Sequence, residues 1–174
     1  SLHDALPILT GAAKTSGSKG VHVIVPVRDI DLPDAAAATR AVAARAERLA
    51  PEVVTTAFLK ADRGGKVFVD ATRSGGASLA CGYSPRVRPG TPVSFPVAWD
   101  DLAAVNPADF TIRSAPAMVG DGDPWADSLP SPQVVPAELI AQGHTIPVAR
   151  VAAMHEGKRR KRAAQREGTP EPER

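Results

Sequence analysis

Glycine and proline interrupt this chain so often that its structural elements must be short. The 174 residues include 14 glycines and 17 prolines, and aromatic residues make up only 4%. The core must therefore be built mostly from Val, Leu, Ile and Ala, with many turns between short elements. The length is enough for one domain with its own core, and 43% hydrophobic and 23% charged residues are typical of a soluble globular protein.

The longest predicted element is a helix that follows a predicted strand. The strand covers 21–27, where β-branched residues are frequent and the nearly continuous apolar run favours burial of both faces. The helix covers 31–50, with Asp31 as its N-cap and Pro33 in its first turn. Helical spacing predicts one apolar stripe, formed by Ala38, Val42, Ala46 and Leu49.

Shorter elements are predicted for the rest of the chain. Residues 14–20 form a polar loop before the first strand. Strands at 53–59 and 66–70 flank a Gly-Gly turn and predict a hairpin. Further elements are predicted at 78–83 and 93–97 (strands), from Trp99 (a helical turn) and at 136–142 (a short helix).

The two ends of the chain differ from its body. Residues 1–8 match the translation of a widely used sequencing adapter, so we expect them not to belong to the natural protein. From His155 onward, seven basic and four acidic side chains give a charge of +3, which leaves −1 for the body out of the overall +2. We therefore divide the chain into an adapter-like stretch (1–8), the main part of the domain (9–115), a loop-rich extension (116–153) and a basic tail predicted to be disordered (154–174).

The sequence also indicates the cellular compartment in which the protein acts. No apolar run approaches the roughly 18 residues needed to span a bilayer, and the N-terminus lacks a secretory pattern. The single cysteine, Cys81, cannot form an internal disulfide, which fits a reducing cytoplasm.

The segment 15–20 has the composition of an anion-binding loop. Its glycines let backbone N–H groups approach an oxygen closely, its hydroxyls donate, and Lys19 supplies positive charge. It is not a Walker A loop, because a serine precedes the lysine, a glycine follows it, and the next element is a strand. His22 lies three residues after Lys19, where it can reach the same anion. The alternatives are an ordinary turn and a core histidine whose partners are backbone groups.

Carboxylates and arginines mark further candidate positions. Asp70 ends a predicted strand, where a carboxylate at the rim of a sheet suits a metal ion or serves as a turn or cap residue. Arg86 and Arg88 lie two apart in an extended segment, so they share a face suited to phosphate or to a solvated basic edge. The pairs Asp29-Ile-Asp31 and Asp121-Gly-Asp123 are expected to serve a helix cap and a turn rather than a metal.

Three segments in order resemble the polymerase domains of bacterial DNA ligase D, which belong to the archaeo-eukaryotic primase superfamily. Lys14-Thr-Ser-Gly-Ser-Lys-Gly-Val-His22 is similar to the family's Ser-Gly-x-Lys-Gly-x-His segment, and Val67-Phe-Val-Asp70 resembles its third motif. Residues 83–86 and 89–102 are similar to its Tyr-Ser-x-Arg and Pro-x-x-Trp-Asp-Glu-Leu stretches. The resemblance covers about 14–112. It implies a mixed α/β fold with a mainly antiparallel sheet of RNA-recognition-motif type, in which 21–27 lies beside 67–70.

The resemblance implies an enzyme, a DNA-directed nucleotidyltransferase that adds ribo- or deoxyribonucleotides to a 3′ end during repair of double-strand breaks by non-homologous end joining. Mn²⁺ or Mg²⁺ would activate the 3′-hydroxyl and steady the leaving pyrophosphate. The implied partners are gapped or 3′-overhanging DNA ends, nucleoside triphosphates, an ATP-dependent DNA ligase (fused or separate) and an end-binding Ku-type protein, at the bacterial nucleoid and away from the membrane. The implied site residues are Ser16, Gly17, Lys19, His22 and Arg86 for the nucleotide, and Asp70 for catalysis and the metal.

The chain departs from the family's pattern in ways that bear on activity. The family's Asp-x-Asp pair lies upstream of the Ser-Gly-x-Lys-Gly-x-His segment, where this chain has only a few residues besides the adapter-like stretch. Ala71 and Ser74 stand where relatives have an aromatic residue and Asn, and Gly82 replaces a Pro. We therefore expect the C-terminal half of the domain, truncated at its N-terminus and inactive by itself. The alternatives are a non-catalytic nucleotide- or nucleic-acid-binding module and a purely structural domain.

Overall fold

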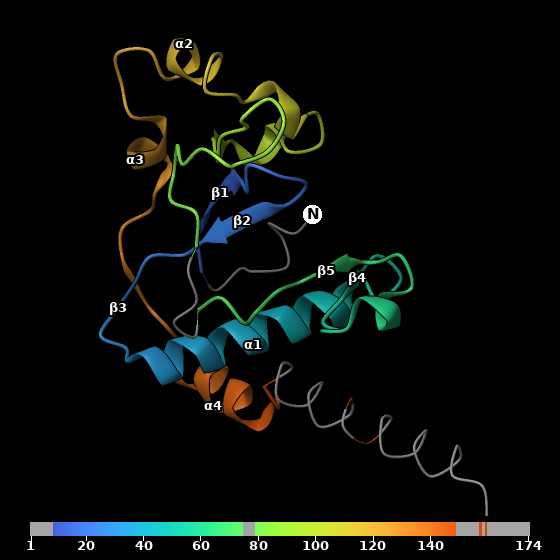
Figure 1. The fold of residues 1–174 in the computed structure, drawn as a ribbon. Helices are drawn as coiled ribbons and strands as arrows, with labels where there is room; N and C mark the ends of the chain where they lie inside the picture. The colour runs from blue at the N-terminus through green and yellow to red at the C-terminus, as the bar shows by residue number, and fades with distance from the viewer. Residues whose placement is uncertain (1–8, 75–78, 149–156, 158, 160–174) are drawn as a thin grey trace, which may run out of the picture. The chain divides into compact units, whose positions relative to one another are not determined.

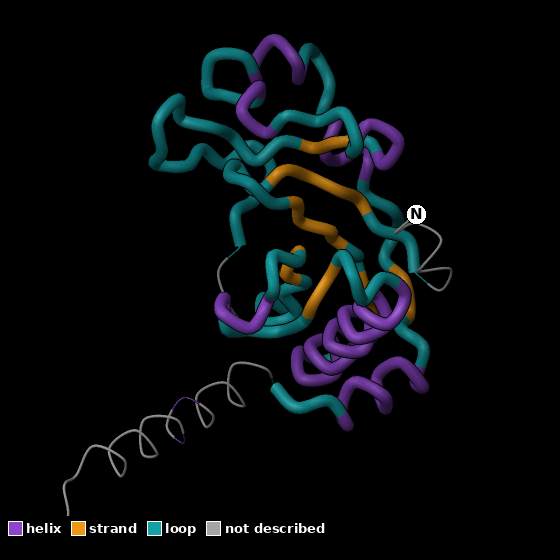
Figure 2. The backbone as a smooth tube through the Cα atoms, turned by 90° about the vertical axis from the view of Figure 1, so that its right-hand side faces the viewer, coloured by secondary structure: helices purple, strands orange, loops and turns teal. Residues whose placement is uncertain are grey.

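The structure, a computed structural model, describes residues 9–74, 79–148, 157 and 159. The chain separates into two units, and each is described by itself. Among the described residues, the first unit contains 9–30 and 79–136, and the second contains 31–74, 137–148, 157 and 159. Figures 1 and 2 show the helices and strands of both. The predictions for 1–8 and for nearly all of the tail lie outside the described residues.

The first unit contains an antiparallel sheet in the order β2-β1-β6. Its central strand β1 (Ala12–Thr15) pairs with β2 (Val21–Ile24) on one side and with β6 (Pro96–Val97) on the other. All four residues of β1 are buried, whereas Val21 and Val23 on the outer strand β2 are 45% and 47% exposed. The prediction that both faces of 21–27 are buried was therefore wrong, because β1 and not β2 is the central strand. The prediction that Lys14 and Thr15 belong to a loop was also wrong, since both residues lie in β1.

The first unit contains a second pair of strands. Strand β3 (Val27–Arg28) runs parallel to β7 (Gln133–Val134). Beside this pair, Thr10 and Gln133 exchange two hydrogen bonds of 2.8 and 2.7 Å. The short helices of this unit are α2 (Ala115–Val119), α3 (Pro124–Ser128) and the 3-10 turns Trp99–Asp101 and Pro107–Asp109. The helical turn at Trp99 is confirmed, while α2 and α3 lie in a region predicted mainly as loop.

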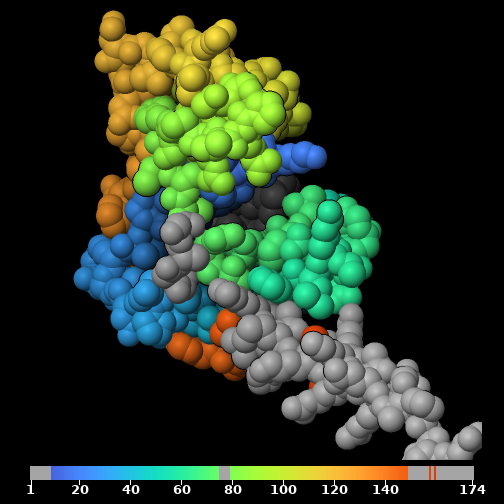
Figure 3. Space-filling view, viewed as in Figure 1, coloured from blue at the N-terminus to red at the C-terminus, as the bar shows by residue number. Residues whose placement is uncertain are grey.

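The core of the first unit is aromatic despite the low aromatic content of the chain. Phe95 stacks on Phe110 with ring centroids 4.9 Å apart, and the Tyr83 ring meets Phe95 edge-on at 5.7 Å. Val93 and Ala115 complete the buried cluster. In the space-filling view, the segment that carries much of this cluster lies directly on the β1–β2 hairpin (Figure 3).

The second unit is built on α1 (Leu32–Leu49), which packs against α4 (Ala137–Thr145; Figure 1). The predicted N-cap is confirmed, because Asp31 accepts a 2.8 Å hydrogen bond from the Asp34 backbone N–H. The buried residues of α1 are all alanine: Ala37, Ala38, Ala41, Ala43 and Ala46. Leu49 is 63% exposed, so the predicted stripe was partly wrong. Alanine and glycine let the two helix backbones approach closely, as a Cβ on Gly143 would lie 1.8 Å from the Ala37 carbonyl oxygen.

The rest of the second unit corrects two predicted pairings. Strands β4 (Val54–Thr55) and β5 (Val67–Phe68) run parallel, joined through a 3-10 turn at Lys60–Arg63. The predicted hairpin was wrong because the connection crosses over. Arg63 holds that crossover, donating to the carbonyl oxygens of Ala57 and Phe58 at 3.1 and 2.7 Å and covering the Phe68 ring at 3.8 Å.

The prediction that 21–27 lies beside 67–70 was also wrong. The strand β2 pairs with β1, whereas β5 pairs with β4, so the two belong to different sheets. The described residues of the predicted strand 78–83 form no strand, and the range ends in a turn where Tyr83 has a positive φ of 62°. The mixed α/β class, with an antiparallel sheet and helices, is confirmed. Within the described ranges, no helix combines the length and the apolar character that crossing a membrane requires.

Candidate functional site

The glycine- and serine-rich segment forms the tight end of the β1–β2 hairpin. Thr15 and Val21 are the last paired residues, and the Ser16 N–H donates to the Gly20 carbonyl oxygen at 2.8 Å. The Ser16 hydroxyl in turn accepts from the Gly20 N–H at 3.2 Å. The hairpin therefore closes on itself and presents Lys19, which is exposed, at its tip.

Gly17 joins this loop to the segment that carries Arg86. Its φ of +66° lies in the left-handed region that glycine tolerates best. A Cβ at Gly17 would lie only 2.5 Å from Cγ of Arg86 and 3.2 Å from the backbone nitrogen of Ser94. The absence of a side chain at Gly17 thus brings the loop backbone against the arginine, two groups suited to one anion.

Lys14 is a buried cation at the base of the hairpin, with a side chain that is 1% exposed. Its Nζ donates to the Ala80 carbonyl oxygen at 2.6 Å and to Ser94 Oγ at 2.7 Å, and lies 3.0 Å from Nδ1 of His22. Burial lowers the pKa of the Lys14 ammonium, Cys81 acts in the opposite direction, and Arg86 adds to the lowering. The strand register explains the contact with the histidine, because Lys14 and His22 are directly paired in β1 and β2.

A network of hydrogen bonds fixes β1 to the segment 93–95. The Thr15 N–H donates to the Phe95 carbonyl oxygen at 2.8 Å, and the Thr15 hydroxyl bonds both Val93 and Phe95, at 3.2 and 2.9 Å. The Ser94 hydroxyl donates to the Thr15 carbonyl oxygen at 2.6 Å. Thr15 and Ser94 are fully buried, so this network holds the base of the hairpin rigidly.

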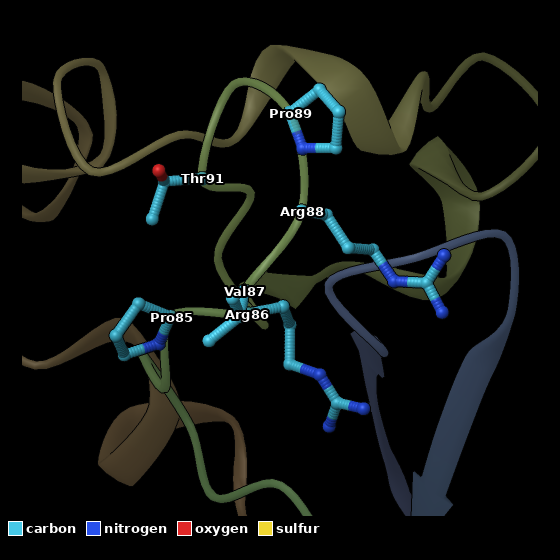
Figure 4. A pocket seen from close by; sticks show the side chains of 6 residues that line it. All are labelled: Pro85, Arg86, Val87, Arg88, Pro89 and Thr91. Carbon is cyan, nitrogen blue, oxygen red and sulfur yellow. The ribbon is translucent and has the colours of Figure 1, made fainter.

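Arg86 and Arg88 lie on a tight loop over 85–91. Pro85 bridges to Val93, and the Arg86 N–H donates to the Pro92 carbonyl oxygen at 2.8 Å. The loop borders an open hollow of about 480 Å³ (Figure 4). Figure 4 shows both guanidinium groups leaving the loop on the side of the β1–β2 hairpin, as their spacing of two residues predicts. Two arginines and the hairpin thus make this face of the first unit basic.

Tyr83 anchors the start of the arginine segment. Its hydroxyl donates to Asp123 at 2.7 Å and accepts from the Trp125 N–H at 2.9 Å. Burial raises the pKa of the Tyr83 hydroxyl, and its hydrogen bond to Asp123 raises it further. A Cβ at Gly82 would lie 2.9 Å from the Trp125 ring, so the glycine that departs from the family's proline makes room for this tryptophan.

Asp70 lies in the second unit, just after β5. Its carboxylate accepts from the Thr72 N–H at 2.9 Å, from the Thr72 hydroxyl at 2.6 Å and from Arg73 at 3.3 Å. Burial acts to raise the pKa of Asp70, but the hydrogen bonds from Thr72 and the charge of Arg73 outweigh it and hold the pKa below its usual value. The Asp70 carboxylate is therefore ionised at neutral pH, and its oxygen atoms are of the hard kind that Mg²⁺ and Mn²⁺ prefer.

The described residues do not by themselves complete a metal centre. Among them, no group of three or more His, Cys, Asp or Glu side chains is arranged to hold a metal ion. Asp31 and Asp123 cap α1 and α3, and Asp29 pairs with Arg28 at 2.6 Å. The capping role predicted for Asp31 is confirmed. Asp123 caps a helix in a segment predicted as a turn, and the ion pair of Asp29 was not predicted.

All five predicted nucleotide-site residues therefore lie in the first unit. Ser16, Gly17 and Lys19 share the hairpin loop, Gly17 touches Arg86, and His22 contacts Lys14. Asp70 belongs to the other unit. The sequence reasoning missed Lys14 and Ser94. The symmetry of a hairpin around its turn could have paired Lys14 with His22, but no local signal links either residue to Ser94, which is 80 positions from Lys14.

The sequence matches the LigD primase-polymerase domain model over residues 5–125, a match that begins within the adapter-like stretch. It is similar to the multifunctional non-homologous end joining protein LigD of Pseudomonas aeruginosa, with 38% identity over 136 residues that cover 74% of this chain and 16% of that protein. The LigD protein of Mycolicibacterium smegmatis is 38% identical over 91 residues, which cover 51% of this chain and 12% of that protein.

The structure is also similar to a solved one, the polymerase domain from Mycobacterium tuberculosis ligase D in complex with DNA. The TM-score is 0.65 at 30% sequence identity, and the match covers 73% of this chain and 46% of that chain. The chain thus spans less than half the length of that solved domain and a small part of the longer relatives.

Proposed function

Because the chain belongs to the LigD primase-polymerase domain family, we propose that it is part of a template-directed nucleotidyltransferase that acts in double-strand break repair. The reaction adds ribo- or deoxyribonucleotides to the 3′ end of a gapped or overhanging DNA end. Support for a DNA substrate comes from the similar polymerase domain of Mycobacterium tuberculosis, which was solved in complex with DNA. The relatives' names support a place in non-homologous end joining. A DNA ligase and an end-binding Ku-type protein belong to the proposal as the partners that the family resemblance implies.

The observation that carries the proposal is the contact between the hairpin loop and Arg86. Gly17 brings the loop backbone against the arginine side chain, and the exposed Lys19 extends from the same loop. Backbone N–H groups, hydroxyls and fixed cations together recognise phosphate oxygens. We assign Ser16, Gly17, Lys19, His22 and Arg86 to the triphosphate of the incoming nucleotide.

We assign Asp70 as one ligand of a catalytic Mn²⁺ or Mg²⁺ ion. Its oxygen chemistry and its lowered pKa fit such an ion, but one carboxylate does not hold two ions against their hydration. The family resemblance assigns the remaining ligands to an Asp-x-Asp pair upstream of the hairpin. When bound, the ions activate the 3′-hydroxyl and stabilise the leaving pyrophosphate.

Primer extension by the complete domain, with the upstream segment restored, tests the proposal. We expect extension of a gapped DNA primer with Mn²⁺ and nucleoside triphosphates, and its loss in Asp70→Ala. The matched control is Asp121→Ala, because Asp121 is an exposed carboxylate in the second Asp-x-Asp pair. Equal extension by Asp70→Ala and the wild type would refute the metal assignment. Triphosphate binding without extension would instead favour a non-catalytic nucleotide-binding module.

A further inference from the structure

The buried contact between Lys14 and His22 constrains the protonation of both side chains. Two of the three partners of Lys14 Nζ must accept. The Ala80 carbonyl oxygen has no proton, and the Ser94 hydroxyl has already given its proton to the Thr15 carbonyl oxygen. Two N–H groups of Lys14 are thereby used, at 2.6 and 2.7 Å.

The third contact, to Nδ1 of His22 at 3.0 Å, depends on the charge of the lysine. An ammonium group has a third N–H to donate, so Nδ1 must accept and the ring proton must lie on Nε2. A neutral amine has only a lone pair left, so Nδ1 would carry the proton instead. The charge of Lys14 and the tautomer of His22 are therefore linked.

The surroundings favour the ammonium form. The contacts of 2.6 and 2.7 Å to two oxygen acceptors have the short lengths of charge-assisted hydrogen bonds. Burial and Arg86 lower the pKa of Lys14, yet all three partners of the amine can act as acceptors, and Cys81 opposes the lowering. An ammonium group satisfies every partner at once.

We infer that Lys14 is a positioning residue, whose ammonium group holds His22 in the Nε2–H tautomer so that the ring offers a donor to a nucleotide phosphate. This inference rests on the proposed nucleotide-binding function. The opposite tautomer would present a lone pair at Nε2, which repels a phosphate oxygen. Lys14 acts through the histidine, because its own three N–H groups are used within the protein. Lys19, which is exposed, has the different role of meeting the phosphate directly.

Nitrogen-15 NMR of histidine side chains tests the inference on the unmodified 174-residue chain without ligand. We expect the His22 ring nitrogens to show the Nε2–H pattern, and the Lys14 Nζ to show a slowly exchanging ammonium signal because it is buried. A predominant Nδ1–H pattern for His22 would overturn the inference. The result needs no variant, so it does not depend on whether a substitution at Lys14 folds.

Two matched variants then separate positioning from direct binding. Lys14→Met should move His22 toward a mixture of tautomers and weaken binding of inorganic tripolyphosphate by the reciprocal of the remaining Nε2–H fraction, about twofold for an equal mixture. Lys19→Met should weaken the same binding but leave the tautomer unchanged. An unchanged tautomer in a folded Lys14→Met, as judged by its amide spectrum, would overturn the inference.

The two proposals fail in different ways. An Nδ1–H tautomer together with tripolyphosphate binding that depends on Lys19 would remove the role of Lys14 and leave the proposed function intact. An Nε2–H tautomer without measurable tripolyphosphate binding would overturn the phosphate role of His22 and count against the proposed function, even though the lysine–histidine contact remained.

Discussion

Lys14 shows how local sequence and final environment diverge at the scale of single residues. Its neighbours are polar and small, so the segment reads as a loop, yet its side chain is 1% exposed. The partners that make burial possible lie 8 to 80 positions away. Asp31 is the opposite case, because a cap depends on residues three positions on, and its role was predicted correctly. A structural role that depends on neighbouring residues, such as this cap, was thus predictable, and one that depends on distant groups was not.

Lys19 provides the most direct residue-scale test of nucleotide binding. In the complete domain, Lys19→Ala should weaken nucleoside triphosphate binding by about 1.5–3 kcal/mol, because it removes a charge-assisted contact to phosphate. Isothermal titration calorimetry in the absence of divalent metal measures the loss. The control is Lys60→Ala, an exposed lysine in the other unit. Equal affinities for wild type and Lys19→Ala would contradict the phosphate-loop assignment.

At the scale of elements, the presence of a helix was easier to predict than the partner of a strand. The long helix, the turn at Trp99 and the short helix near 137 have local signals, namely a cap, spacing and proline. The partners of the strands have none, because pairing depends on which strand occupies the middle of the sheet. Thus 21–27 was assigned to the wrong neighbour, and the crossover held by Arg63 was mistaken for a hairpin turn.

Because α1 and α4 approach each other closely, we expect a substitution of Gly143 to lower the stability of the protein. Gly143→Ala would place a Cβ 1.8 Å from the Ala37 carbonyl oxygen, so the helices must separate. We expect destabilisation of at least the roughly 1–3 kcal/mol that overpacking commonly costs. Chemical denaturation followed by circular dichroism measures it. Gly122→Ala serves as control, since nothing lies within 4 Å of the added methyl group. Equal stability of the two variants would show that the helices are not in such close contact.

Glu47 links α1 to β4 in a manner that depends on pH. Its carboxylate accepts from the Thr55 hydroxyl, the Thr56 hydroxyl and the Thr56 N–H at 2.9, 2.6 and 3.0 Å. Burial acts to raise the pKa of Glu47, but these hydrogen bonds and the charge of Lys66 outweigh it, so the pKa lies below its usual value. A lowered folded-state pKa means that the stabilisation is present above the unfolded pKa of about 4.3 and is lost as pH falls through the folded pKa.

Glu47→Gln should therefore lower Tm at pH 7 by an amount that corresponds to about 1 kcal/mol. The difference from wild type should stay constant down to about pH 5 and shrink below about pH 4, where both proteins lack the charge. Thermal unfolding followed by circular dichroism across this range measures it. Glu52→Gln, an exposed glutamate, should show no such dependence. A difference that persists unchanged at pH 3 would contradict the role of the ionised carboxylate.

At the scale of the whole molecule, the predicted site residues divide between two units. The phosphate-loop residues and Arg86 belong to one, and Asp70 belongs to the other. The family, the mixed α/β class and the order of the motifs were all predictable from the sequence, because short motifs in a fixed order are local features. The division of the site residues between two units was not, because it depends on long-range strand pairing. Among the described residues, no group of three or more metal-binding side chains surrounds Asp70.

Residues 9–174 should therefore fail to extend a primer, because one carboxylate does not hold two divalent ions. The assay uses gapped DNA, Mn²⁺ and nucleoside triphosphates, with the complete domain run in parallel as the positive control. Circular dichroism establishes that residues 9–174 are folded under the assay conditions. Robust extension by this chain alone would mean that the metal site lies elsewhere among its residues.

The pairing of Lys14 with His22 also fixes the length of the loop between them. Successive residues of a strand point to opposite faces, so one residue inserted or deleted between Thr15 and Val21 would shift the register and turn His22 to the other face of the sheet. Substitutions within the loop can leave this geometry in place, whereas a single-codon insertion cannot. Natural and laboratory variation in this segment should therefore consist of substitutions far more often than of insertions or deletions.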